Sequence, residues 1–296
     1  MPAGPATTAV GGQPVAVRSA SPEDAARWDG FLAAQPGLTP LSRFAWGDIL
    51  RDVFSTSPLR LIAETASGEI AGTLFAYAAR GNDGRPRIYS LNRGLVATTP
   101  VAEAALLQAV GRLQIEHGAA LAELSSARQP ATAEAEGPVR HAIVKPLAAT
   151  EEETWSGLRA KTRNMVRKAE KNQVSLDRDI DALDAFYDIY AERMLELNVA
   201  LYGRALFHAI VRVFPDDVEL IVARQNGRTI GGLFLIMGSD TAVYPAQATL
   251  SAYMDTAATQ ALIWAAAQTC IARGIRRLDM GESRPDSPVY RSKVNF

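Results

Sequence analysis

A run of basic side chains between Trp155 and Val174 is the part of this sequence best suited to bind or process a charged substrate. Its cations are Arg159, Lys161, Arg163, Arg167, Lys168 and Lys171, and Glu170 is the one acid among them. Such a cluster is either a solvated helix face or an anion site for the phosphates of a nucleotide, a pyrophosphate-linked precursor or a tRNA. Charge alone does not choose between these two interpretations.

The same run is predicted to form one helix that ends near Asn172. Thr150 and Glu153 have the spacing of a capping box, and Glu151 and Glu152 place negative charge at the N-terminus of the helix, where it is favourable. Apolar residues follow at intervals of three to four and predict one buried face: Trp155, Leu158, Met165, Val166 and Ala169. The basic side chains then lie on the other face.

The sequence has few of the groups that covalent or metal-dependent catalysis requires. The three histidines, His117, His141 and His208, are scattered and are expected at the surface or at helix ends. The single cysteine, Cys270, lies in an apolar helical run and is expected to be a buried, inert thiol. There is no Gly-x-Ser-x-Gly elbow, metal-ligand spacing, Walker loop or Rossmann fingerprint. We therefore expect neither a bound metal nor a bound cofactor.

Composition indicates a folded protein of two domains. The chain has 296 residues, of which 48% are hydrophobic and 21% charged, with a net charge of −1. Binding to nucleic acid would therefore require a local patch of positive charge. No DNA partner is expected. Residues 1–14 are predicted to be a disordered leader, because they lack the charged and apolar regions of a signal peptide. No apolar run is long enough to span a bilayer, and a cytoplasmic location is expected.

The order of predicted elements repeats once along the chain. Each half reads strand, helix, helix, antiparallel strands, helix, strand, and the segments IAETASGEIAGTLFAY and IVARQNGRTIGGLFLI align by eye. Residues 125–137 are rich in Ala, Glu, Pro and Gly and are predicted to connect the halves. We expect an N-terminal domain over 15–137 and a C-terminal domain over 138–296. Two unrelated α+β domains are the alternative.

Four segments together resemble the Fem-like transferases of the GNAT (acyl-CoA N-acyltransferase) superfamily. The basic run, K-T-R-N-M-V-R-K-A-x-K-N, resembles the family's R-N-x-x-R-K-A-x-K-x-G segment. The segments 89–96 and 193–207 resemble Y-x-x-R-G-P-V and R-x-x-G-T-P-x-x-x-x-x-F. Residues 278–296 are similar to F-D-F-G-R-S…G-x-Y-x-F-K-x-x-F/W, although Ser292 stands where Phe is usual. The resemblance implies an α/β protein of two tandem GNAT-like domains, each a mixed, largely antiparallel sheet flanked by helices.

The resemblance implies transfer of an acyl or aminoacyl group to an amine. Such a donor is already activated, so the enzyme has to align a neutral amine and support a tetrahedral oxyanion. Lys293 is implied to lie beside the donor and acceptor channel, where its cation stabilises developing negative charge; a surface lysine is the alternative. Asp279 ends a strand and is implied to orient or deprotonate the amine. The alternative for Asp279 is a capped turn with Gly281.

The remaining implied site residues are substrate-binding. Arg163, Arg167 and Lys168 would hold phosphates, whereas the others would line the cleft: Tyr202, Arg204, Gly281, Arg284 and Tyr290.

The identity of the donor depends on a loop that the sequence lacks. Acetyl-CoA-dependent GNAT proteins usually carry an Arg/Gln-x-x-Gly-x-Gly/Ala loop, which binds pyrophosphate at a helix start. The nearest segments here are 92–95 and 246–248, and neither has that form. We therefore expect aminoacyl-tRNA as co-substrate and a peptide-like or nucleotide-linked amine as acceptor, in a cell-wall precursor or a peptide natural product. An acyl-CoA-dependent N-acyltransferase and a non-catalytic RNA-binding tandem GNAT protein are the alternatives.

Overall fold

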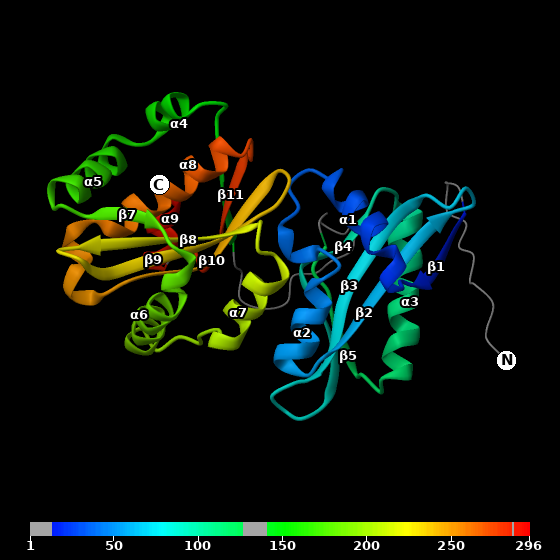
Figure 1. Ribbon diagram of the computed structural model, residues 1–296. Helices are drawn as coiled ribbons and strands as arrows, with labels where there is room; N and C mark the ends of the chain where they lie inside the picture. Colours follow the sequence, from blue (N-terminus) through cyan, green and yellow to red (C-terminus); the bar gives the residue numbers. More distant parts are fainter. Residues whose placement is uncertain (1–13, 127–140, 286) are drawn as a thin grey trace. The chain divides into compact units, whose positions relative to one another are not determined.

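The structure, a computed structural model, describes residues 14–126, 141–285 and 287–296 (Figure 1). The chain divides into two compact units, residues 1–134 and 135–296. Each unit contains its own sheet flanked by helices, which confirms the expected α/β class. The predicted leader, apart from Pro14, and the predicted boundary at 137/138 lie outside the described residues. No helix in the described parts of the chain is both long and apolar enough to cross a bilayer.

The first unit is a five-stranded sheet in the order β1-β2-β3-β4-β5, with only β4 and β5 parallel. Its elements are β1 (Val15–Ser19), η1 (Pro22–Asp24), α1 (Ala25–Ala33), η2 (Pro40–Ser42), α2 (Trp46–Phe54), β2 (Ser57–Thr65), β3 (Ile70–Arg80), β4 (Pro86–Ala97), α3 (Pro100–Glu116) and β5 (Leu121–Glu123). Leu106 of α3 and Trp28 of α1 are almost wholly buried, so helices on both sides of the sheet contribute to the core.

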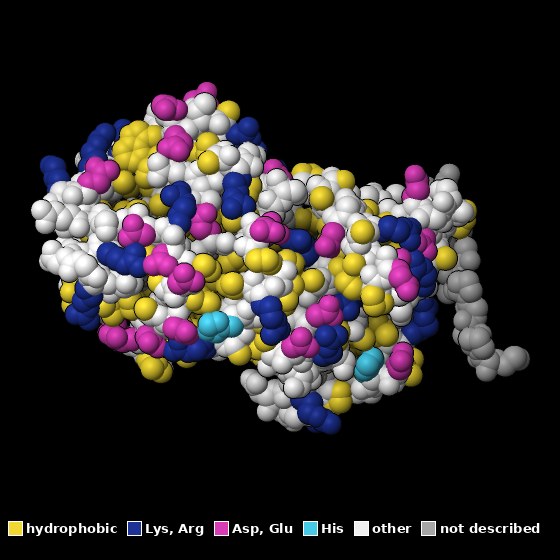
Figure 2. All heavy atoms as spheres, in the orientation of Figure 1, with side chains coloured by type: hydrophobic (Ala, Val, Ile, Leu, Met, Phe, Trp, Pro, Cys, Tyr) yellow, Lys and Arg dark blue, Asp and Glu magenta, His cyan; other side chains and the backbone are white. Residues whose placement is uncertain are grey.

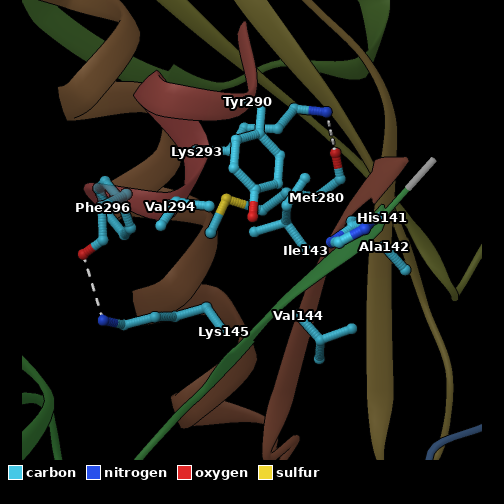
Figure 3. Close-up of a pocket in the computed structure, with 10 residues that line it drawn as sticks. All are labelled: His141, Ala142, Ile143, Val144, Lys145, Met280, Tyr290, Lys293, Val294 and Phe296. Atoms are coloured by element: carbon cyan, nitrogen blue, oxygen red, sulfur yellow. Dashed lines mark hydrogen bonds between the residues drawn. The ribbon is translucent and has the colours of Figure 1, made fainter. Parts of the chain in front are cut away.

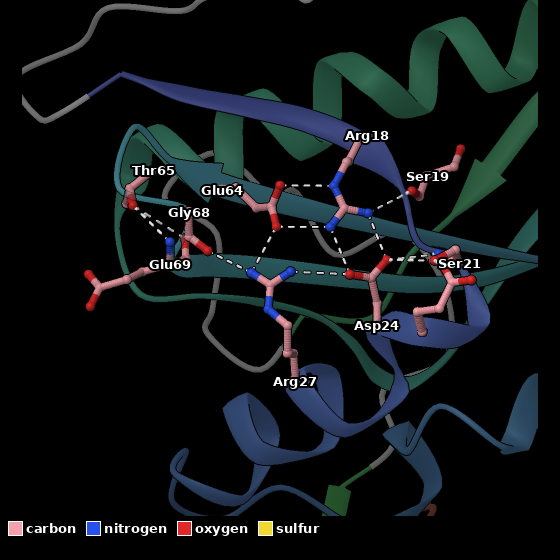
Figure 4. A network of polar contacts seen from close by, with 10 residues as sticks. Arg18, Ser19, Ser21, Asp24, Arg27, Glu64, Thr65, Gly68 and Glu69 are labelled. Carbon is pink, nitrogen blue, oxygen red and sulfur yellow. Dashed lines mark hydrogen bonds and ion pairs between the residues drawn. The ribbon is translucent and has the colours of Figure 1, made fainter.

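An ion-pair network joins the start of this unit (Figure 4). The carboxylate of Asp24 accepts two hydrogen bonds of 2.7 Å from the guanidinium of Arg18 and one of 2.9 Å from the main-chain N–H of Ser21. Arg18 and Arg27 both donate to Glu64 of β2. These charge-assisted bonds hold β1, η1 and α1 against β2.

The second unit is a six-stranded sheet in the order β6-β11-β10-β9-β8-β7. Its elements are β6 (His141–Pro146), α4 (Glu151–Gly157), α5 (Ala160–Lys171), β7 (Ser175–Arg178), η3 (Ile180–Ala182), α6 (Leu183–Glu196), α7 (Arg204–Val213), β8 (Val218–Gln225), β9 (Arg228–Met237), β10 (Thr241–Thr249), η4 (Ser251–Thr256), α8 (Ala258–Ala272), β11 (Arg277–Ser283) and α9 (Pro288–Val294). Figure 1 shows α4, α5 and α8 on one side of this sheet and α6 and α7 on the other.

The predicted single basic helix is wrong, because the segment forms two helices, α4 and α5. The capping box of Thr150 and Glu153 is present at the start of α4 as expected. The break falls at Leu158 and Arg159, whose ψ angles are 148° and 143°. Leu158 is only 2% exposed, and its extended backbone lets the side chain enter the core. Burial of this leucine outweighs the helical propensity of the flanking residues.

Strands β10 and β11 run parallel and then separate. They pair only through residues 241–243 of β10 and 277–279 of β11, and the partner strands β9 and β6 show register shifts just beyond this point. A bulge bends a strand and re-aims its side chains. The carboxyl ends of β10 and β11 therefore separate beyond Val243 and Asp279.

Candidate functional site

The end of β11 forms a turn around a buried carboxylate. Asp279 is 2% exposed, and its Oδ1 accepts a hydrogen bond of 2.7 Å from the main-chain N–H of Gly281. Gly281 has φ +73°, a left-handed conformation that other residues adopt at a cost. The capped turn that the sequence offered as an alternative for Asp279 is therefore present.

Lys293 lies directly over this turn. It belongs to the last turn of α9, and its Nζ donates a hydrogen bond to the main-chain oxygen of Met280. The Nζ also lies 6.0 Å from the centroid of the buried Tyr244 ring on β10. Burial lowers the pKa of Lys293, and the charge of Asp279 acts in the opposite direction. Lys293 is thus a partly desolvated amine and not the surface lysine of the alternative interpretation.

A pocket of about 290 Å³ lies between β6, the end of β11 and α9 (Figure 3). Its lining is His141, Ala142, Ile143, Val144, Lys145, Met280, Tyr290, Lys293, Val294 and Phe296. Figure 3 shows Lys293 and Lys145 reaching in different directions, with Lys145 Nζ donating to the main-chain oxygen of Phe296 at 3.2 Å. Burial, and then the charge of Arg159, lower the pKa of Lys145. The pocket therefore combines apolar walls with two amines whose pKa values are lowered by burial.

Comparison with known proteins agrees with this geometry. Residues 156–288 match the acetyltransferase (GNAT) domain family. The structure superposes on the crystal structure of FemX with a TM-score of 0.75 over 94% of this chain and 92% of that one, at 13% identity. The chain has a Fem-like tandem GNAT fold. Among curated protein sequences, none is significantly similar to it.

Two further solved structures share this fold over most of their length. A tandem GNAT protein from the clavulanic acid biosynthesis pathway superposes with a TM-score of 0.53 and 12% identity, covering 95% of this chain and 94% of that one. The C-terminal domain of a putative lysylphosphatidylglycerol synthetase from Agrobacterium fabrum gives 0.52 and 10%, covering 88% and 79%. The GNAT domain match and the Fem-like fold together support an acyltransferase.

The distribution of lysine within the Fem-like fold is uneven. The chain has five lysines, and all of them lie in the second unit. Lys161, Lys168 and Lys171 belong to α5, whereas Lys145 and Lys293 line the pocket. Arginine, in contrast, forms surface ion pairs such as Arg224 with Asp179. An ammonium group loses its proton more readily on burial than a guanidinium does, and burial lowers the pKa of the two lysines that line the pocket, Lys145 and Lys293.

The three predicted phosphate-binding residues have different surroundings on α5. Arg163 closes the helix break, because its guanidinium donates to the main-chain oxygens of Ser156, at 3.1 Å, and Leu158. Arg167 and Lys168 are exposed, and Arg167 lies 5.5 Å from the ring of Trp155. Figure 2 shows Lys and Arg side chains gathered over α5 and acidic side chains over the start of α4. Arg167 and Lys168 are therefore available to an anion, whereas Arg163 already has a structural role.

The structure does not place Tyr202, Arg204 or Arg284 in the pocket lining. Tyr202 is 48% exposed, and its main-chain N–H donates to the hydroxyl of Tyr190. Arg204 pairs with Asp184 and Asp188 of α6 and stacks on Tyr187. Arg284 is exposed, and its main-chain oxygen accepts from Ser287 at the start of α9. A role for these three residues in acceptor binding stays a prediction.

The pocket also contains groups that sequence reasoning missed. Tyr290 was expected, and its ring lies 6.0 Å from that of His141, which is exposed as predicted but was not assigned to a site. Lys145 and Met280 of the lining, and Tyr244 beside Lys293 but outside the lining, were not expected. Lys145 and Tyr244 carry no motif, and a backbone oxygen gives no sequence signal. Only the alternation of side chains between the two faces of the sheet, along β6 and β10, could have shown which residues share a face.

Helices α3 and α8 follow β4 and β10, the strands that pair in parallel in each unit. Some main-chain N–H groups at the N-termini of these two helices already have hydrogen-bond partners. At the start of α8, Ala257 is buried against Ala169 of α5, and the hydroxyl of Thr256 accepts a hydrogen bond from the N–H of Ala258. In the first unit, Thr99 caps α3, Pro100 has no N–H to offer, and Glu103 adds negative charge to the first turn. In each helix, one of the N–H groups that could bind a pyrophosphate is thus already paired with a threonine hydroxyl.

No group of three or more His, Cys, Asp and Glu side chains is arranged for metal binding in the ranges 14–126, 141–285 and 287–296.

Proposed function

We propose that this protein is an acyltransferase that moves an aminoacyl group from aminoacyl-tRNA to the amine of a peptide-like or nucleotide-linked small molecule. The observation that supports the proposal is Lys293, a half-buried amine held over the turn at Gly281, where β10 and β11 separate. An ammonium group has three N–H donors, and Met280 uses one of them. The others are available to an oxygen that becomes negative during transfer.

The chemistry needs little more than position and charge. The acceptor nitrogen attacks the ester carbonyl of the donor, a C–N bond forms, and the carbonyl oxygen becomes an oxyanion. When the oxyanion collapses, the C–O bond of the ester breaks, and the leaving hydroxyl of the ribose takes a proton that the attacking amine gives up. Lys293 stabilises the oxyanion, and preorganised donors of this kind are usually the largest contribution to the rate.

Two features support tRNA as the donor. The exposed cations of α5, including Lys161, Arg167 and Lys168, form a sequence-independent site for a phosphate backbone. In addition, the segments 92–95 and 246–248 do not have the form of the Arg/Gln-x-x-Gly-x-Gly/Ala loop that binds the pyrophosphate of coenzyme A in GNAT proteins. An acyl-CoA donor is the second candidate, and the match to the acetyltransferase (GNAT) domain family is what favours it.

A transfer assay tests the donor. Purified protein is incubated with total tRNA charged with a mixture of radiolabelled amino acids and with small amines from a cell extract, with and without RNase. A parallel reaction contains labelled acetyl-CoA in place of tRNA. We expect a labelled amide product that disappears when RNase is added before the protein.

Two results would contradict the proposal. Product that forms only from acetyl-CoA and ignores RNase would show an acyl-CoA-dependent enzyme. If no donor gives product while labelled tRNA still binds, the protein is an RNA-binding tandem GNAT protein without transferase activity.

A further inference from the structure

Helix α9 is too short to fix the position of Lys293 by itself. It has seven residues, and Val289 and Val294 are 51% and 45% exposed, so its own burial is small. Isolated helices shorter than about 12 residues are marginal in water. The place of Lys293 therefore depends on the contacts that hold the two ends of α9.

The N-terminal end of α9 is held locally. The Ser287 hydroxyl accepts a hydrogen bond of 3.0 Å from the N–H of Tyr290, and it donates to the main-chain oxygen of Arg284 at 2.8 Å. This cap joins α9 to the residues that follow β11, but it lies six positions before Lys293 and leaves the last turn of the helix without support.

The C-terminal end is held by the basic helix α5. Asn295 is the C-cap of α9, and its main-chain oxygen is one of the acceptors that a helix end leaves without an intrahelical partner. The hydroxyl of Thr162 donates to this oxygen at 2.8 Å, and Arg159 donates to the Asn295 side chain. Thr162 is only 6% exposed, so its hydroxyl is a fixed, largely water-shielded donor.

The residue after Asn295 reinforces the same attachment. Phe296 is 4% exposed and belongs to the core cluster of the second unit, together with Leu158 at the α4–α5 break. Its main-chain oxygen accepts from Lys145 of β6. The last turn of α9 is thus fixed to α5, to the core and to β6, and Lys293 lies two residues before the point of attachment.

We infer that Thr162, assisted by Arg159, is a positioning residue that sets the place of Lys293 for acyl transfer. The inference rests on the proposed function. Thr162 does not line the pocket, and it acts through the backbone of Asn295. Thr162 lies on α5, whose outer face carries Lys161 and Lys168, and its hydrogen bond to Asn295 therefore joins the proposed donor-binding helix to the helix that carries Lys293.

Lysine labelling tests the position of Lys293 without any substrate. The rate of acetic anhydride labelling of Lys293 is measured by mass spectrometry against pH, with the exposed Lys168 as internal reference. In Thr162→Val the apparent pKa of Lys293 is expected to rise toward the ordinary value of about 10.4, because the released amine becomes solvated. Its labelling at high pH also becomes faster.

Matched variants separate position from stability. Thr162→Ser keeps the hydroxyl and is expected to restore wild-type labelling. Ser156→Ala removes a hydroxyl that bonds only within α4 and should change nothing. If Thr162→Val does not fold, Asn295→Ala, which removes the acceptor of Arg159, should still raise the pKa of Lys293, by a smaller amount. A folded Thr162→Val protein with wild-type Lys293 labelling would overturn the inference.

The transfer reaction gives the second readout. In Thr162→Val, kcat is expected to fall about ten-fold or more at unchanged KM for the donor, since misplacement of a catalytic group slows the chemical step without removing a binding contact. An equal kcat in wild type and Thr162→Val would contradict the positioning role. If the wild type transfers nothing from any donor, the proposed function is wrong, and the labelling experiment still decides whether Thr162 positions Lys293.

Discussion

Lys293 and Lys168 carry the same ammonium group in opposite surroundings. Lys168 is exposed on α5, where a permanent charge attracts phosphate but can be screened by salt. Lys293 is packed between Met280, Tyr244 and Gly281, where the local dielectric is low and each electrostatic contact is stronger. Only the buried lysine can therefore contribute strongly to a transition state.

The pH dependence of the reaction follows from this burial. Two titratable residues lie close to Lys293. Asp279 favours the cation, and Tyr244 stays neutral because burial, and then the charge of Asp279, raise its pKa. Burial lowers the pKa of Lys293 below that of a free lysine. Because the ammonium form stabilises the oxyanion, activity is present below the folded pKa and is lost as pH rises through it.

The measurement is kcat against pH for wild type and Lys293→Arg. We expect the wild-type rate to fall at a pH below the ordinary lysine value of about 10.4, and this fall to be absent in Lys293→Arg, because a guanidinium keeps its proton throughout the range. The activity that remains in Lys293→Arg is lower, since the larger group does not fit the same space. A high-pH fall that is identical in both proteins would assign it to another group.

At the scale of elements, the sequence predicted α5 better than α9. The charged start and capping box of α4 and the basic face of α5 were readable because caps and charges are local signals. The break at Leu158 was not readable, since it depends on the core that receives this side chain. Helix α9 was not predicted, because seven residues span too few helical turns for an amphipathic pattern to be recognised. Ser287 and Pro288 nevertheless have the form of a helix start.

The exposed cations of α5 lead to a prediction on tRNA binding. Lys168→Ala is expected to weaken binding and to reduce the slope of log K against log salt concentration by about 0.7–0.9, the loss of one phosphate contact. The measurement is a fluorescence titration of labelled tRNA at several salt concentrations. The control is Arg112→Ala, an exposed cation on α3 of the first unit, which should leave the slope unchanged. Equal slopes for wild type and Lys168→Ala would exclude Lys168 from the tRNA-binding surface.

At the scale of the whole molecule, the two units share an order of elements but differ where their parallel strands meet. In the first unit, the N–H of Ser125 donates to the Ser90 hydroxyl at 2.6 Å, and Leu95 forms a bridge with Ser126, so that the chain after β5 rejoins β4. In the second unit, β10 and β11 pair over three residues only. The first unit also contains no lysine. The lysines that we propose to act in acyl transfer and donor binding therefore all belong to the second unit.

The repeat itself was predictable, and the site was predictable only in part. Similar strand–turn–strand segments that end at Tyr77 and Ile236 indicated two similar domains, because turn residues and the alternating hydrophobicity of strands are local sequence patterns. Lys293, Asp279 and Gly281 were found through resemblance, and the structure brings them together. Lys145 and Thr162 could not be found, because their roles depend on residues more than 130 positions away in the sequence.

The most direct test of the account is the rate of amide formation in a single turnover, with protein in excess over charged tRNA, for wild type and Lys293→Met. Methionine keeps much of the side-chain length and removes the cation. We predict a rate lower by about 10²–10³-fold, as for the loss of one oxyanion donor, with tRNA binding unchanged. If Lys293→Met forms the amide at the wild-type rate, Lys293 does not stabilise the transition state, and the reaction centre lies elsewhere.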